Sequence, residues 1–125
     1  SNGVLLEYID YSFSPSDYDS KMGTTTATDS SVVIPETFEY DGIWYKVTSI
    51  DANAFRYSTT LESITIPSTV LVIQKQAFYA CQILNQITFL GTIEQWNAIK
   101  LRLECFYNTP SLSEVICTDG TVSLK

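Results

Sequence analysis

The sequence contains no histidine, and its charged residues are few and mostly acidic. Without histidine, the Ser-His-Asp and Cys-His catalytic arrangements, the usual zinc ligands and the commonest general base at neutral pH are excluded. Charged residues make up 17% of the chain, and fourteen acidic against seven basic side chains give a net charge of −7. Such a surface repels phosphate backbones and anionic lipids. We therefore expect no nucleic-acid partner and no enzymatic activity.

Long apolar runs and paired-cysteine motifs are also missing. No stretch approaches the roughly 18 apolar residues of a membrane-spanning helix, and the first residues lack the basic and apolar regions of a signal peptide. We expect no membrane-spanning segment, and an export signal would have been removed ahead of residue 1. The three cysteines, Cys81, Cys105 and Cys117, have no CxxC spacing. Buried thiols are favoured over a single disulfide, which stays open as the alternative.

What the sequence does contain is an internal repeat of 23 residues, in which residues 47–69 align with residues 70–92. A unit this short cannot bury its apolar face alone and must stack on a neighbour. The repeat predicts an α/β repeat solenoid, mostly short β-strands with short helical turns, in one domain of residues 1–125. The eight identical pairs are Val47/Val70, Ile50/Ile73, Ala54/Ala77, Phe55/Phe78, Leu61/Leu84, Ile64/Ile87, Thr65/Thr88 and Thr69/Thr92.

Each unit is expected to contain one short strand. The alternation of Ile64 with Ile66, and of Ile87 with Phe89, indicates strands with one face in the core. The Ala-Phe pair of each unit is expected in a single helical turn that directs the phenylalanine inward. Matches outside the two central units extend the array to about three repeats over residues 32–118. The third repeat absorbs five extra residues around Trp96 to Glu104, and the segment of residues 92–100 in it is helix-like.

Hairpins and caps are expected to interrupt or close the array. Asp41-Gly42 predicts a hairpin insertion at residues 37–46, and Asp119-Gly120 predicts a closing hairpin within a C-terminal cap of residues 119–125. Residues 1–31 are interpreted as an N-terminal cap and loop. Within them we expect a strand at residues 4–9 and a loop over residues 14–31 that includes an edge strand at most.

The repeat resembles the BspA-like leucine-rich repeats of bacterial surface proteins. The resemblance rests on Val47-Thr48-Ser49-Ile50-x-x-x-Ala54-Phe55 and on Leu61-Glu62-Ser63-Ile64-Thr65-Ile66-Pro67-Ser68, followed by the second Ala-Phe pair. It covers about residues 32–125, with a lead-in through Tyr40-Asp41-Gly42-Ile43-Trp44 and an exit at Cys117-Thr118-Asp119-Gly120. Members often carry Gly-Cys where this chain has Tyr57-Ser58 and Ala80-Cys81.

The resemblance implies leucine-rich-repeat coils with capping hairpins in a secreted or outer-surface bacterial protein, and members of the family are implicated in adhesion. The leading expectation is a non-enzymatic binding module for a protein or glycan on a host or bacterial surface, with no cofactor. One alternative is a structural spacer or a terminal fragment of a longer repeat protein. Another is an acidic carboxylate hydrolase that uses Glu36, Glu39 and Asp41.

Aromatic side chains are the candidate ligand contacts, because such side chains carry much of the energy of binding surfaces. We select Tyr40, Trp44, Tyr45, Tyr57 and Tyr79, with packing in the core or cap as the competing interpretation. No catalytic or metal-binding residue is assigned. Asp17 and Asp19 alternate in the way that calcium ligands do, but they lack the glycine and terminal glutamate of an EF-hand loop, so calcium binding stays open.

Overall fold

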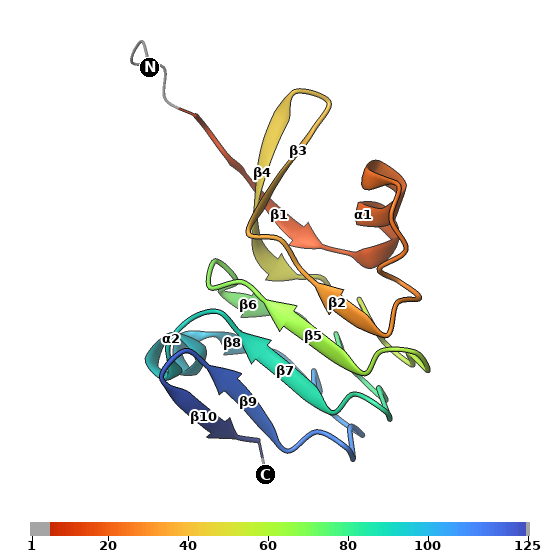
Figure 1. Ribbon diagram of the computed structural model, residues 1–125, viewed down its shortest axis with the longest axis vertical. Helices are drawn as coiled ribbons and strands as arrows, with labels where there is room; N and C mark the ends of the chain where they lie inside the picture. Colours follow the sequence, from red (N-terminus) through yellow and green to blue (C-terminus); the bar gives the residue numbers. More distant parts are fainter. Residues whose placement is uncertain (1–5, 125) are drawn as a thin grey trace.

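The computed structural model describes residues 6–124 and consists of stacked coils that contribute strands to two sheets (Figure 1). One sheet has the order β1-β4-β6-β8, with β3 also paired to β4, and the other has the order β10-β9-β7-β5-β2. The strands of the first sheet are β1 (Ile9–Phe13), β3 (Thr37–Tyr40), β4 (Ile43–Ile50), β6 (Val72–Ile73) and β8 (Lys100–Leu101). Those of the second are β2 (Ser31–Val33), β5 (Ser63–Ile66), β7 (Gln86–Phe89), β9 (Glu114–Cys117) and β10 (Gly120–Ser123).

The pairing register of the parallel strands reproduces the repeat found in the sequence. Ile64 pairs with Ile87, an offset of 23 residues, and Ile87 pairs with Val115, an offset of 28. The five additional residues lie ahead of β8, in a segment that includes helix α2 (Ile93–Ala98). Thr92 caps this helix in a reciprocal capping box with Gln95. The repeat fold and the inserted helix of the third unit are therefore confirmed.

The core is a stack of matching side chains from successive coils. Four phenylalanine rings lie one above another, with centroids 6.3 Å apart for Phe13 and Phe55, 5.5 Å for Phe55 and Phe78, and 5.5 Å for Phe78 and Phe106. The last two pairs are tilted by only 4° and 10°. Aliphatic side chains of both sheets complete one buried cluster that runs from Tyr11 to Cys117. Each coil thus covers the apolar face of the next.

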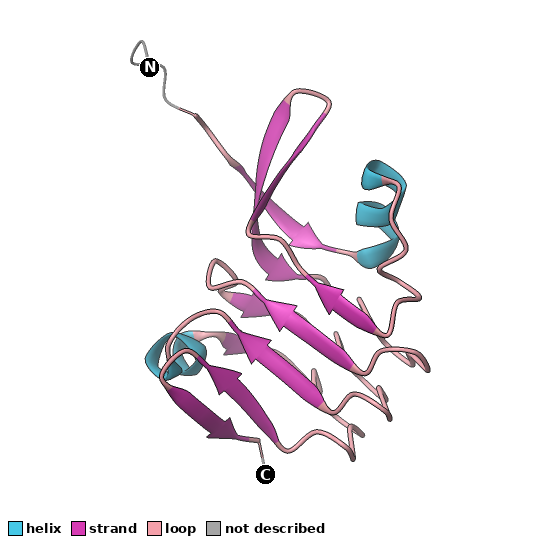
Figure 2. Cartoon of the chain, viewed as in Figure 1, coloured by secondary structure: helices cyan, strands magenta, loops and turns pink. Residues whose placement is uncertain are grey.

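The coils differ from the expected ones in two respects. Each central coil contributes a second strand, β6 or β8, of only two residues, and such strands are too short to give an alternating pattern. The Ala-Phe segments do not form helix; they are consecutive turns, as shown by the bonds from the N–H of Ala54 to the oxygen of Asp51 and from the N–H of Ser58 to the oxygen of Phe55. Within residues 6–124 both helices lie outside these turn segments (Figure 2).

The N-terminal cap is where the sequence-based prediction was wrong. The strand expected at residues 4–9 is β1 instead, which directs Tyr11 and Phe13 into the core; Val4 and Leu5 lie outside the described residues. The segment expected as a loop contains helix α1 (Pro15–Met22), with Pro15 in its first turn and Gly23 in the left-handed conformation at its C-terminus. Only Pro15 of this helix is fully buried, which explains why the helix lacks an apolar period.

Both expected hairpins are present. Thr37 pairs with Lys46 and Tyr40 with Ile43, so β3 and β4 enclose Asp41 and Gly42, whose positive φ angles of 53° and 77° suit a tight turn. At the other end, β10 returns antiparallel along β9 and covers the outer edge of that sheet (Figure 1).

Left-handed backbone recurs at equivalent positions of the turns that precede β5, β7 and β9. One set is Asn53, Gln76 and Glu104, and the second is Tyr57, Ala80 and Asn108. Their φ angles lie between 53° and 61°, a conformation that is costly for any residue with a Cβ atom other than asparagine or aspartate. Glycine adopts it without that cost, which gives a physical reason for glycine at this position in similar repeats.

We predict that Ala80→Gly stabilises the protein by about 0.5–1 kcal/mol. Relief of the left-handed strain, about 1–2 kcal/mol, exceeds the entropy that glycine adds to the unfolded chain. The melting temperature should rise by about 2–4 °C in thermal unfolding followed by circular dichroism. The control is Ala77→Gly, at a fully buried alanine with negative φ, which should lower the melting temperature. Destabilisation by Ala80→Gly would contradict the strain argument.

Candidate binding surface

Three tyrosines form a continuous aromatic row along the edge of the stack that is made by the turns before β5, β7 and β9. The ring centroids of Tyr57 and Tyr79 are 5.6 Å apart in an edge-to-face arrangement, and those of Tyr79 and Tyr107 are 5.4 Å apart and stacked. Tyr57 and Tyr107 are 58% and 57% exposed, while Tyr79 between them is half-buried. We call Tyr57, Tyr79 and Tyr107 the tyrosine ladder.

The exposed Arg56 lies against the first tyrosine of the ladder, Tyr57. Its guanidinium carbon lies 4.8 Å from the ring centroid of Tyr57 and 5.4 Å from that of Tyr79, within the range of a cation–π contact. The guanidinium also donates to the hydroxyl of Tyr57 at 3.4 Å. Within residues 6–124 no carboxylate pairs with Arg56, because the one ion pair there joins Lys21 and Asp17. Tyrosine and arginine are the residue types enriched in the energetic centres of protein interfaces.

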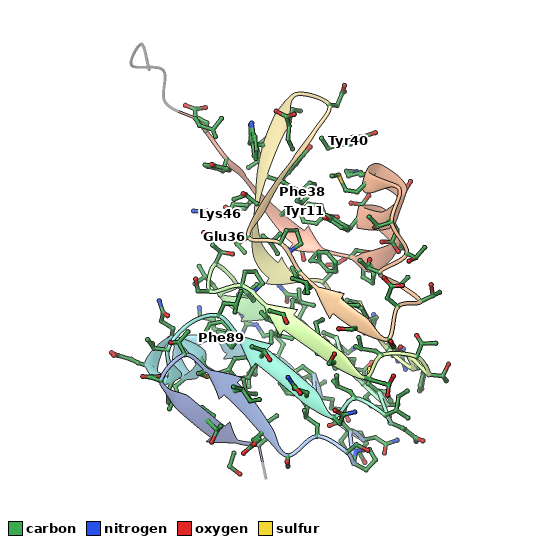
Figure 3. All side chains as sticks on the ribbon, viewed as in Figure 1. Tyr11, Glu36, Phe38, Tyr40, Lys46 and Phe89 are labelled. Atoms are coloured by element: carbon green, nitrogen blue, oxygen red, sulfur yellow. The ribbon has the colours of Figure 1, made fainter. Side chains whose placement is uncertain are left out.

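Tyr45 belongs to the packing of the N-terminal cap. Its ring stacks on Phe38 at 5.2 Å and meets Tyr11 edge-on at 5.8 Å. The ring of Tyr18 of α1 meets that of Phe38 edge-on, with the centroids 5.1 Å apart. Figure 3 shows Phe38 and Tyr11 together between the hairpin and α1, with Tyr40 farther along the same side. Tyr45 is thus held by aromatic neighbours.

Tyr40 and Trp44 lie on opposite faces of the hairpin. Tyr40 is exposed near its tip and receives the Lys21 ammonium over its ring at 5.2 Å. Trp44 alternates with Tyr45 along β4 and so points to the other face, where Tyr8 meets it edge-on at 6.2 Å. Lys46 lies on that same side, away from Tyr40 (Figure 3).

The structure therefore brings together only two of the five residues selected from the sequence. Tyr57 and Tyr79 touch, whereas Tyr40, Trp44 and Tyr45 belong to the hairpin. Tyr107 and Arg56 were not among the residues selected from the sequence. Tyr107 follows Phe106 directly, as Tyr79 follows Phe78, so applying the 28-residue offset of the third unit would have found it.

The two aspartates considered for calcium, Asp17 and Asp19, lie on helix α1, and both accept hydrogen bonds from other groups of the protein. Asp17 accepts hydrogen bonds from the Tyr11 hydroxyl at 2.6 Å and from Lys21 at 3.0 Å, and these bonds lower its pKa. Burial raises the pKa of Asp19, but four hydrogen bonds outweigh this and lower it overall; they come from the hydroxyls of Thr24 and Thr26 and from the N–H groups of Thr26 and Ala27. Asp19 thus organises the segment that follows α1.

We predict that the segment after α1 loosens in acid because Asp19 becomes protonated. Its pKa is lower in the folded state, so its stabilisation is complete above its unfolded pKa of about 3.9 and is lost as the pH falls through the folded value. Asp19→Asn should remove about 1 kcal/mol at pH 7 and flatten the pH dependence below pH 5. Hydrogen exchange at the amides of Thr26 and Ala27 measures the change.

The control for this prediction is Asp10→Asn, at an exposed aspartate of β1 outside the α1 segment. It should leave both amides as protected as in the wild type. Equal acid sensitivity of wild type and Asp19→Asn would contradict the assigned role.

The carboxylates considered for hydrolysis do not form a site. Glu36, Glu39 and Asp41 are all exposed, and Asp41 lies in the tip of the hairpin. Over the described range 6–124, no three acidic or cysteine side chains gather closely enough to hold a metal ion. A carboxylate hydrolase needs two acidic side chains that face each other across a substrate cleft, and these three exposed residues do not form such a pair of buried groups.

The three cysteines are buried free thiols, as the sequence analysis favoured. The thiol of Cys81 donates to the carbonyl of Phe55 at 2.9 Å and so bridges two coils. Cys105 occupies the position of Ala77 in the third unit. Burial raises the pKa of the Cys81 and Cys105 thiols to about 11.

We predict that Cys81 and Cys105 resist alkylation in the native protein at pH 8, because burial and a pKa about 3 units above that pH leave well under ~1% thiolate. Brief iodoacetamide treatment followed by peptide mass spectrometry should label neither, and all three cysteines should be labelled in denaturant. Rapid labelling of Cys81 in the folded protein would show that its coil opens.

A family model of the BspA type leucine rich repeat region (6 copies) matches residues 48–125, more than half of the chain. The chain belongs to this leucine-rich-repeat family. The match begins inside β4 and includes the tyrosine ladder, the coils and the closing hairpin. Leucine-rich repeats of this type typically serve in protein interaction at surfaces, and the predicted resemblance is confirmed.

The chain is also similar to the crystal structure of a leucine rich cell surface protein from Faecalibacterium prausnitzii A2-165, with a TM-score of 0.59 and 24% identity. The similarity covers 71% of this chain and 23% of that one, so this chain spans about a quarter of its length. At this identity the likeness is one of fold. No curated protein matches the chain. Within residues 6–124, neither helix has the length and apolar character needed to cross a bilayer.

Proposed function

We propose that the chain is a non-enzymatic binding module of a secreted or surface-exposed bacterial protein, and that its tyrosine ladder contacts a protein ligand on a host or bacterial surface. In this proposal residues 1–125 act as one leucine-rich-repeat domain. The observation that carries it is the exposed row of three touching tyrosines with Arg56 over two of them. Family membership and the surface location stated for the similar protein support the same setting.

The physical case for the tyrosine ladder rests on pre-organisation. Each tyrosine projects from a turn whose backbone is bonded to the next coil; the N–H of Tyr57 donates to the oxygen of Tyr79 at 2.8 Å. The rings also restrain one another, so a ligand need not pay the full entropic cost of ordering them. Large, rigid and partly polar side chains are the usual energetic anchors of protein interfaces.

A spacer role is the second candidate, and one observation favours it. The last coil has a groove of about 300 Å³ lined by Phe106, Leu112 and Leu124, beside the final ring of the phenylalanine stack. Elsewhere in the same coil, Leu101 and Leu103 are 43% and 62% exposed. An incompletely covered end suits a coil that continues into, or rests against, another unit.

We predict that the double substitution Tyr79→Ser and Tyr107→Ser abolishes ligand binding without unfolding the protein. The wild type is applied to an array of extracellular-matrix and bacterial surface proteins, and bound proteins are titrated by biolayer interferometry. Loss of two of the three tyrosines should weaken binding by roughly several hundred-fold, since such truncations cost about 2 kcal/mol each and together about 4 kcal/mol.

The matched control is Tyr40→Ser, an exposed tyrosine on the hairpin outside the ladder, which should leave binding unchanged. Thermal unfolding of each variant checks that the fold is retained. Binding that survives the double substitution would refute the ladder as the contact surface. An empty array would favour the spacer.

A further inference from the structure

A groove of about 380 Å³ opens beside the tyrosine ladder, and a difference in side-chain size between coils creates it. Its walls include Tyr57 and Asn108, which occupy the same left-handed turn position as Ala80 in the coil between them. Because Ala80 is small, the middle coil leaves a hollow flanked by the larger side chains of its neighbours. Two coil spacings separate those walls, about 10 Å.

The groove combines one aromatic wall with polar groups that have no protein partner. Within residues 6–124, the side-chain amides of Gln82 and Asn108 and the hydroxyl of Thr59 form no hydrogen bond with another side chain or with the backbone. The two amides each offer a donor and an acceptor to a ligand. Ile83, 42% exposed, adds an apolar patch.

No side chain that lines the groove is charged, although the chain carries 21 charged residues. A carboxylated or sulfated ligand would find no cation among these lining residues; Arg56 lies outside the lining, in a cation–π contact with the ring of Tyr57, and the protein has a net charge of −7. A neutral ligand is therefore favoured.

From these features we infer that the groove is a binding site for a neutral saccharide. A sugar ring presents an apolar C–H face, which packs against the ring of Tyr57, and hydroxyls that both donate and accept, which pair with Gln82 and Asn108. An extended peptide fits less well. The N–H groups of Tyr57 and Ala80 already donate to the carbonyls of Tyr79 and Tyr107, so they are closed to strand addition.

The site is separable from the tyrosine ladder, because Tyr57 is the one residue that the groove lining shares with it. Ala80→Leu fills the hollow, while Ala80→Gly keeps it open and keeps the left-handed backbone. Asn108→Gly removes an amide at a position where glycine is unstrained. Tyr107→Ser alters the ladder on the side away from Tyr57.

The experiment screens the full chain on an array of neutral mono- to hexasaccharides, with sialylated and sulfated glycans as comparison. Free saccharides that score are then titrated by calorimetry and by nitrogen-15 NMR. The expected result is binding of a neutral saccharide that shifts the amides of Ala80, Gln82 and Ile83. Ala80→Leu and Asn108→Gly should each weaken binding at least tenfold, whereas Ala80→Gly and Tyr107→Ser should bind within twofold of the wild type.

Three results would overturn the inference: no neutral saccharide bound, binding confined to acidic glycans, or wild-type affinity in a folded Ala80→Leu variant. If Ala80→Leu fails to fold, Asn108→Gly decides alone. Protein binding that depends on Tyr107 together with a blank glycan array would support the ladder and reject the groove, so the two proposals fail separately.

Discussion

The pairing of one coil with the next through parallel backbone hydrogen bonds is the constraint on which the rest of the structure depends. A repeat of 23 residues has too little apolar surface to form its own core, so every buried side chain requires a neighbouring coil. The pairing of Ile64 with Ile87 fixes this contact, and the same register stacks Phe55 on Phe78. Insertions are tolerated where they leave the register intact, as α2 does by lengthening the path to β8.

Features with a strong local pattern were predictable from the sequence, and features without such a pattern were harder to find. The repeat and both hairpins follow from apolar spacing and from Asp-Gly turns, which are strong local determinants. The sheet of β1, β4, β6 and β8 escaped prediction because strands of two residues, such as Val72–Ile73, carry no period. Helix α1 escaped because the chain is held there by Tyr11, Asp17 and Asp19 through polar contacts, not by an apolar stripe.

In the candidate site, too, some residues were predictable from the sequence and others were not. Tyr57 and Tyr79 were identified because each follows a repeated phenylalanine, and stacking converts similar positions in the sequence into contact in space. Tyr107 was missed because the five-residue insertion changes the offset, although its place after Phe106 is equivalent. On the hairpin, alternation established that Trp44 and Tyr45 face opposite ways. Alternation alone did not show which of the two faces of the hairpin helix α1 would cover.

The turn edge can differ in side chains from coil to coil because its backbone is held from within the stack. The N–H of Tyr57 bonds to Tyr79 and the N–H of Ala80 to Tyr107, so the left-handed turns are maintained by inter-coil hydrogen bonds and by the buried phenylalanine of each unit. A side chain at these positions is therefore not needed to fill the core or to hold the turn. Tyr57, Ala80 and Asn108 differ widely in size on one backbone path, and that difference produces a groove without disturbing the core. The regularity that lets so short a repeat fold is thus also what makes its surface adjustable one coil at a time.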